Sequence, residues 1–225
     1  MIINMPEEQK RDARYLSKFV AGAAIGLFDA SLNFVWDEVI VSLRKKIVFY
    51  GLDTFFDSAV YDKIRDQYND EEDLLGIKDK VLLDTLKKLE WISDIVYRKL
   101  CHILDMRNQI GASHPNTYDI NSYELLGWLQ TCVKEVIADK PSSNAIHVKD
   151  IMENLRNNKQ EIDEITLSTI EKAVSEFSTG MAGNLLRSLF GLYIADNTLP
   201  EVRKNILKLL SLIHISEPTR QAEIS

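Results

Sequence analysis

The sequence is poor in the residues that interrupt regular structure. Among its 225 residues there are only nine glycines and five prolines. A β-rich chain needs many turns, and turns draw heavily on both residues. No stretch shows the strict alternation of polar and apolar residues that is typical of a strand. These shortages favour an all-α fold.

Cysteine, long apolar runs and a leader pattern are also scarce or absent. The two cysteines, Cys101 and Cys132, lie in amphipathic segments with no CxxC or zinc-ligand spacing, so we interpret them as small buried hydrophobic residues of a reduced protein. No apolar run is long enough to cross a bilayer. The first ten residues lack the basic-then-apolar order of a signal peptide. We therefore expect a cytoplasmic protein without a membrane anchor.

An excess of positive charge is missing as well. The chain has 27 basic and 34 acidic residues and a net charge of −7, which argues against broad electrostatic binding of nucleic acid. A local cationic cleft is still compatible with this balance. HExxH, GxSxG, Walker and zinc-ligand patterns are absent, which excludes several reaction classes. The acidic run 69–73 is better interpreted as a solvated loop and helix start than as a metal site, because adjacent carboxylates project in different directions.

Apolar residues spaced by three and four define the expected helices. The pattern predicts long helices over residues 23–50 and 78–109, shorter helical segments over 53–68, and a helix over 122–138 capped by Asn121 or Ser122. The polar segment 139–144 is the clearest boundary. Beyond it we expect helices over 147–157, 162–178, 181–195 and 199–209, which resemble the start of a HEAT-like α-solenoid. The domains are thus 1–140 and 145–209.

A possible site stands at the end of the second long helix, where residues 107–114 read Arg-Asn-Gln-Ile-Gly-Ala-Ser-His. Arg107 follows Ile103 by four residues and stays on the apolar face, so we expect it to border a packed surface or a subunit contact. Arginine binds phosphate through a permanent charge and a planar fork of donors. His114 is able to transfer a proton near neutral pH. The structural alternative is a cation that complements the helix dipole, followed by a glycine stop.

The segment 23–138 resembles the HEPN superfamily of small helical domains. Its hallmark is an arginine, a polar residue and a histidine after four to six intervening residues. Arg107, Asn108 and His114 match it, with six residues between the arginine and the histidine. The order of a long helix, a second helix ending in the motif and a third amphipathic helix agrees with this resemblance, which implies an HEPN-like helical bundle.

The resemblance implies a metal-independent RNA endonuclease of a toxin or antiviral abortive-infection system, working as a homodimer in which two motifs form one cleft. Arg107 would hold the phosphate, His114 would act as general acid or base, and Asn108 would orient either group. No cofactor is implied, and an antitoxin or sensor partner would fit such a system. Two alternatives stay open: a non-catalytic module that binds nucleotides or proteins, and a plain helical scaffold.

The last residues, 210–225, are a separate matter. Residues 210–220 read as one translated frame of a transposase-type sequencing adapter, and 221–225 fit continued reading beyond it. We therefore expect that this segment is a non-native tail, that His214 is not a site residue, and that the natural protein continues past Leu209.

Overall fold

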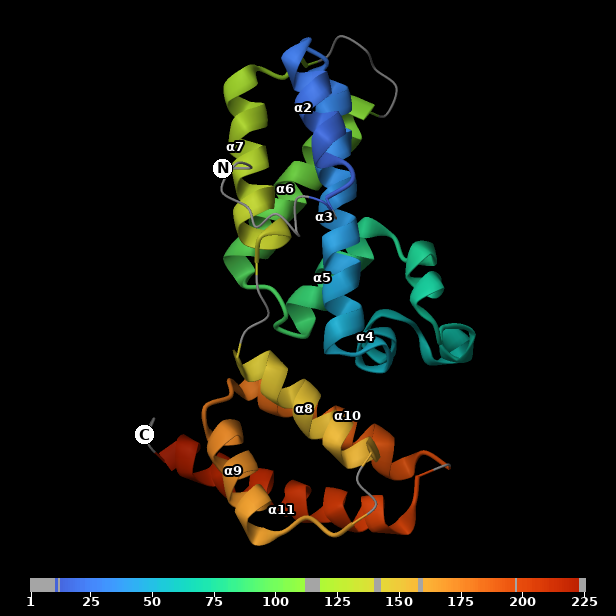
Figure 1. Ribbon diagram of the computed structural model, residues 1–225, viewed down its shortest axis with the longest axis vertical. Helices are drawn as coiled ribbons and strands as arrows, with labels where there is room; N and C mark the ends of the chain where they lie inside the picture. Colours follow the sequence, from blue (N-terminus) through green and yellow to red (C-terminus); the bar gives the residue numbers. More distant parts are fainter. Residues whose placement is uncertain are drawn as a thin grey trace. The chain divides into compact units, whose positions relative to one another are not determined.

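The computed structural model describes residues 11, 13–111, 118–139, 143–157, 160–196 and 198–222. Helices joined by turns make up this part of the chain, and no strand occurs within it, so the fold is all-α as the sequence predicts (Figure 1). None of the helices in these ranges combines the length and apolar character that crossing a membrane requires.

The chain divides into two compact units. The N-terminal unit comprises Met1–Val48 and Ser58–Lys140, and the C-terminal unit comprises Phe49–Asp57 and Pro141–Ser225. The second division follows Lys140, next to the polar segment that marks a boundary in the sequence. The short segment Phe49–Asp57 groups with the C-terminal unit, although the sequence predicts that it belongs to the first domain.

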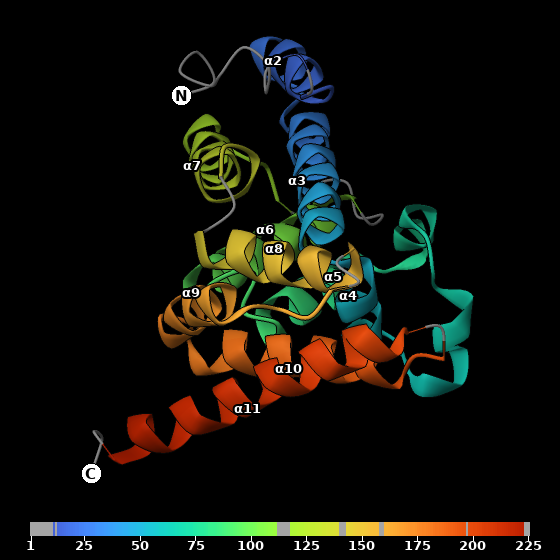
Figure 2. The same ribbon diagram turned by 60° about the horizontal axis from the view of Figure 1, so that its bottom comes forward.

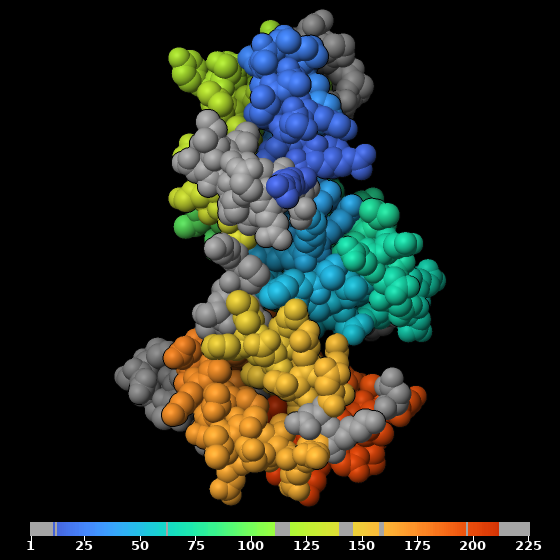
Figure 3. All heavy atoms as spheres, viewed as in Figure 1, coloured from blue at the N-terminus to red at the C-terminus, as the bar shows by residue number. Residues whose placement is uncertain are grey.

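The N-terminal unit is a helical bundle. Its helices are α2 (Leu16–Ala24), α3 (Phe28–Tyr50), α5 (Asp79–Lys88), α6 (Asp94–Gly111), α7 (Ser122–Cys132) and the π-helical turn η4 (Val133–Ile137). Helix α4 (Leu52–Ala59) and the 3-10 turns η2 (Asp62–Gln67) and η3 (Glu71–Gly76) connect α3 to α5. In the space-filling view η2 and η3, coloured teal, stand out to the side of the long blue helix α3 (Figure 3). The bundle core is mostly apolar, with Trp36, Leu43, Leu86 and Leu100 among its fully buried side chains.

The predicted helix over 23–50 is wrong at its start. Helix α2 ends at Ala24 and α3 begins at Phe28, because Gly26 adopts a φ of 81° that few other residues tolerate. Gly22 lets the two helices approach closely, since a Cβ there would lie 2.7 Å from Ser31 Oγ. The small residues of this segment therefore form a tight corner between helices.

The predicted helix over 78–109 is two helices. Helix α5 ends at Lys88, Glu90 takes a φ of 56°, and α6 begins at Asp94. The Trp91 amide donates to the Leu86 carbonyl at 2.9 Å, which closes the turn. The apolar spacing ran on through the break because Leu89 and Ile92 are buried beneath the turn itself.

Two of the polar segments adopt the local structures predicted for them. In the acidic run, Asp73 accepts hydrogen bonds from the Asn69 and Asp70 amides at 2.7 and 2.9 Å and starts η3. These bonds lower the pKa of the Asp73 carboxyl. Asn121 caps α7 by accepting from the Tyr123 and Glu124 amides, both at 3.0 Å. Both are ordinary helix starts.

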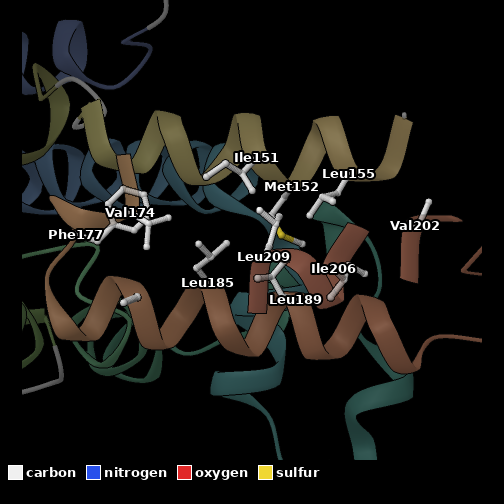
Figure 4. Packing of buried hydrophobic residues seen from close by; sticks show 11 residues of the cluster. Ile151, Met152, Leu155, Val174, Phe177, Leu185, Leu189, Val202, Ile206 and Leu209 are labelled. Atoms are coloured by element: carbon white, nitrogen blue, oxygen red, sulfur yellow. The ribbon is translucent and has the colours of Figure 1, made fainter. Parts of the chain in front are cut away.

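The C-terminal unit contains four further helices: α8 (Ser143–Asn157), α9 (Glu164–Ser175), α10 (Thr179–Ile194) and α11 (Pro200–Ala222). Helices α10 and α11 lie side by side (Figure 2). Figure 4 shows Ile151, Met152 and Leu155 of α8 facing Leu185 and Leu189 of α10, with Leu209 of α11 between them. This apolar cluster is the core of the unit.

The segment Phe49–Asp57 also belongs to the C-terminal unit. It is held by a 2.8 Å hydrogen bond between Thr54 and Ser188 and by an ion pair of Asp53 with Arg156. Helix α11 continues to Ala222, past the end predicted at Leu209, and residues 210–217 contain no glycine or proline that would interrupt it. The non-native origin of residues 210–225 stays a prediction.

Candidate functional site

Arg107 is placed by the burial pattern of α6. Leu100 and Ile103 are buried at 0% and 1% exposure, and Arg107 continues the same face one turn later. Its side chain keeps 31% exposure. The guanidinium therefore stands at the edge of the bundle, between the packed interior and the surface, as the spacing from Ile103 predicts.

Three hydrogen-bonding or charged groups hold the guanidinium of Arg107. Nε donates to Asn33 Oδ1 on α3 at 3.0 Å, and Nη1 donates to Asn108 Oδ1 at 3.3 Å. Nη1 also lies 3.7 Å from Asp79 Oδ2 on α5. Within the part of the chain that the structure describes, no hydrogen bond is made by Nη2. Toward the described residues, one end of the fork thus keeps unused donors.

The partner carboxylate is itself fixed. Asp79 Oδ2 accepts a 2.8 Å hydrogen bond from Trp36 Nε1, and Trp36 is fully buried on α3. A buried tryptophan has few alternative orientations, so this bond anchors Asp79 beside Arg107. A chain of contacts therefore runs from the bundle core to the exposed guanidinium.

A second carboxylate adds to the charge at this place. Burial raises the pKa of Asp37 above its ordinary value of 3.8, and the charge of Asp79 acts in the same direction. Arg107 and Lys18 oppose this rise in the pKa. The site therefore combines two carboxylates and two cations, and it is less positive than an arginine standing alone.

The other two predicted site residues have different outcomes. Asn108 is exposed beside Arg107, and its Oδ1 accepts from Nη1. Asn108 therefore orients the arginine in this structure. His114 lies outside the described residues, so its position relative to Arg107 stays a prediction.

The linear sequence pattern does not predict the contacts of Asn33, Asp37 and Asp79 with the site. Asn33 and Asp37 are four residues apart on α3, on the border of the apolar stripe that contains Trp36. That border position was an available signal. Asp79 was harder to identify, because an acidic residue in the first turn of a helix is ordinarily explained by the helix dipole.

The cysteines and the possible metal ligands can also be placed. Cys132 is buried as predicted, and burial raises the pKa of its thiol to about 12. Cys101 is only half-buried, and its sulfur accepts a 3.4 Å hydrogen bond from Lys80 Nζ, because α6 turns this side toward α5. Among the described side chains, no group of three or more His, Cys, Asp or Glu residues is arranged to hold a metal ion.

Comparison with known proteins adds no family: no family model, curated protein or solved structure matches this chain. The HEPN resemblance therefore depends on the motif at Arg107, Asn108 and His114 and on the order of the helices.

Proposed function

We propose that the N-terminal unit is an HEPN-like, metal-independent RNA endonuclease that acts in the cytoplasm as a toxin or antiviral abortive-infection effector. The observation that carries the proposal is the Arg107 guanidinium. It is oriented by Asn33 and Asn108 and has donors on Nη2 that no described residue uses. These donors and the permanent charge of the guanidinium suit the oxygens of a phosphate.

In the proposed reaction, the 2′-hydroxyl of one nucleotide attacks the adjacent phosphorus. The new O2′–P bond forms as the P–O5′ bond breaks, which leaves a 2′,3′-cyclic phosphate and a 5′-hydroxyl. His114 transfers a proton, either from the attacking 2′-hydroxyl or to the leaving 5′-oxygen. Arg107 stabilises the negative charge that grows on the phosphate.

A homodimer is part of this proposal. One histidine cannot serve as acid and base in the same step, and a twofold axis would supply a second motif from an identical subunit. The exposed edge that carries Arg107 and Asn108 is the surface at which the two motifs would meet. An antitoxin or sensor protein would fit such a system.

The test is cleavage of radiolabelled cellular RNA by the purified chain with chelator present. We expect His114→Ala to lower the rate by about 10²- to 10⁴-fold, the usual value of a general acid or base. Arg107→Ala should also abolish cleavage, and Arg107→Lys should restore only part of it, because a point charge cannot replace the planar fork.

Matched controls lie on the same helix. His102→Ala removes an exposed histidine that packs edge-on against Trp128, and Arg98→Ala removes an exposed arginine paired with Asp94. Both should cleave at the wild-type rate. Full activity of His114→Ala, or loss of wild-type activity on addition of chelator, would refute the mechanism.

The second candidate function is a non-catalytic module that binds nucleotides or proteins. It is favoured by the contacts of Arg107 with Asn33 and Asp79, which join α6 to α3 and α5. If this function is correct, Arg107→Ala weakens the bundle, and no RNA is cleaved at any pH. A thermal melt of the same variants distinguishes the two candidates.

A further inference from the structure

The carboxylates beside Arg107 bear on which phosphate the site accepts. Asp79 Oδ2 is 3.7 Å from Nη1 and is held there by Trp36. Asp37 also interacts electrostatically with both Arg107 and Asp79. Any phosphate that binds Nη2, next to Nη1 on the same guanidinium, therefore approaches an anchored negative charge at the same time.

This arrangement treats singly and doubly charged phosphates differently. An internal phosphodiester carries one negative charge, whereas a terminal phosphomonoester carries nearly two at neutral pH. At an unopposed cation the second charge strengthens binding. Beside Asp79 and Asp37 that advantage is offset, while the hydrogen bonds to the guanidinium are the same for both ligands.

We infer that Asp79 is a specificity-determining residue, which makes the Arg107 site select an internal phosphodiester of a nucleic-acid chain over a terminal phosphate group. The inference depends on the proposed function, because it assigns the Arg107 site to phosphate. It also separates an endonuclease from a module for free nucleotides, whose phosphates are terminal.

The experiment compares two ligands that cannot be cleaved. One is a 2′-O-methyl diadenosine dinucleotide with a single phosphodiester, and the other is 2′-O-methyl adenosine 5′-monophosphate. Dissociation constants are measured calorimetrically for the full chain. Wild type should bind the dinucleotide at least as tightly as the monophosphate. Asp79→Asn should shift the ratio of the two constants toward the monophosphate by about three- to tenfold, as removal of one nearby charge predicts.

The variants are chosen to keep the fold. The side-chain amide introduced by Asp79→Asn would still offer an oxygen to Trp36 Nε1. Asp84→Asn is the matched control, since it removes the same charge from the same helix. In the wild type, Asp84 pairs with Lys80 at 2.9 Å and not with Arg107. Asp37→Asn is a second test, and it should shift the ratio in the same direction as Asp79→Asn.

Each outcome is decisive. A ratio that stays constant in Asp79→Asn and Asp37→Asn, or that moves equally in Asp84→Asn, overturns the inference and leaves the proposed function intact if RNA is still cleaved. The inference is also overturned, with the proposed function left intact, if wild type binds the monophosphate more tightly than the dinucleotide. If Arg107→Ala leaves both dissociation constants unchanged, or if wild type binds neither ligand, phosphate does not bind at Arg107, and the proposed function fails with the inference.

Discussion

The two units use polar side chains in different places. In the N-terminal unit, Trp36, Asp79 and Arg107 form a polar chain between the sides of three helices. In the C-terminal unit, the interhelical space is filled by the apolar cluster of Figure 4, and the buried Asn205 instead fastens a loop. Its Oδ1 accepts from the Ile162 amide at 3.0 Å, and its Nδ2 donates to the Gln160 carbonyl at 2.8 Å.

Asn205 has a structural role, whereas the fold does not require the charge of Arg107. Asn205 hydrogen-bonds two backbone groups of the loop, which is a sufficient reason for its burial. Among the described residues, Arg107 contacts side chains and no backbone group, and the carboxylate of Asp79 lies beside its charge. A bundle of this kind can pack with apolar residues alone, and the role proposed for the charged cluster is the binding of phosphate at the surface.

The largest expected effect on stability is in the apolar cluster of the C-terminal unit. Leu189→Ala removes a side chain of 0% exposure from α10 and leaves a cavity. We expect a loss of about 2–5 kcal/mol in the free energy of unfolding, measured by urea denaturation. Leu207→Ala on α11, where the side chain is 51% exposed, is the control and should change little. Equal losses in both variants would mean that the cluster is not the core.

The next effect concerns the loop fastened by Asn205. Asn205→Ala leaves the Ile162 amide and the Gln160 carbonyl without their side-chain partner, so we expect a loss of about 1–3 kcal/mol in the free energy of unfolding. Hydrogen exchange at the Ile162 amide should accelerate more than exchange within α10. Unchanged protection at Ile162 would show that the bond does not hold the loop.

The sequence predicted the helical class well and the helix breaks poorly. Periodic leucines identify a helix, but they continued through Leu89 and Ile92, which are buried at a turn. The two wrong predictions of unbroken helices in the N-terminal unit concern breaks that depend on a positive φ, at Gly26 and Glu90. The corner at Gly26 contains a residue suited to it, whereas Glu90 is an ordinary helix former, and only the packing of α5 against α6 explains the turn.

In the candidate site, the position of Arg107 was predictable from the sequence, but its partners were not. The spacing from Ile103 predicts that Arg107 borders a packed surface, and the contacts with Asn33 and Asp79 confirm this. Those two partners were not predictable, because they are 74 and 28 positions away in the chain and neither belongs to a motif. A carboxylate beside an arginine is a tertiary fact, which the linear pattern does not contain.

A smaller effect is expected where the site itself is changed. Arg107→Ala should lower the free energy of unfolding by less than about 1 kcal/mol, because the ion pair with Asp79 is long and solvent reaches both partners. The same change should abolish the proposed cleavage. A loss of several kcal/mol would instead make Arg107 a structural clamp, like Asn205, and the contrast between the two units would disappear.

The smallest effect is a difference in pH dependence between the units. Burial raises the pKa of Asp37 in the N-terminal unit, so its charged form costs stability above the folded pKa. That cost disappears as the pH falls through the folded pKa toward the ordinary value of 3.8. In the C-terminal unit, hydrogen bonds from Lys208 and Lys204 lower the pKa of Glu161. Its stabilisation is present above the ordinary value of 4.5 and is lost as the pH falls through the folded pKa.

The two carboxyls therefore respond to acid with opposite signs, and conservative variants reveal each sign. Asp37→Asn should raise the protection of amides in the N-terminal unit against hydrogen exchange at pH 7, and the gain in protection should vanish near pH 3.8. Glu161→Gln should lower the protection of C-terminal amides at pH 7, and that loss should vanish in stronger acid, below the folded pKa. Hydrogen exchange followed unit by unit measures both. If Asp37→Asn destabilises the N-terminal unit at pH 7, then the charge of Asp37 supports the bundle through Arg107 and Lys18, and the two units use their carboxylates in the same way.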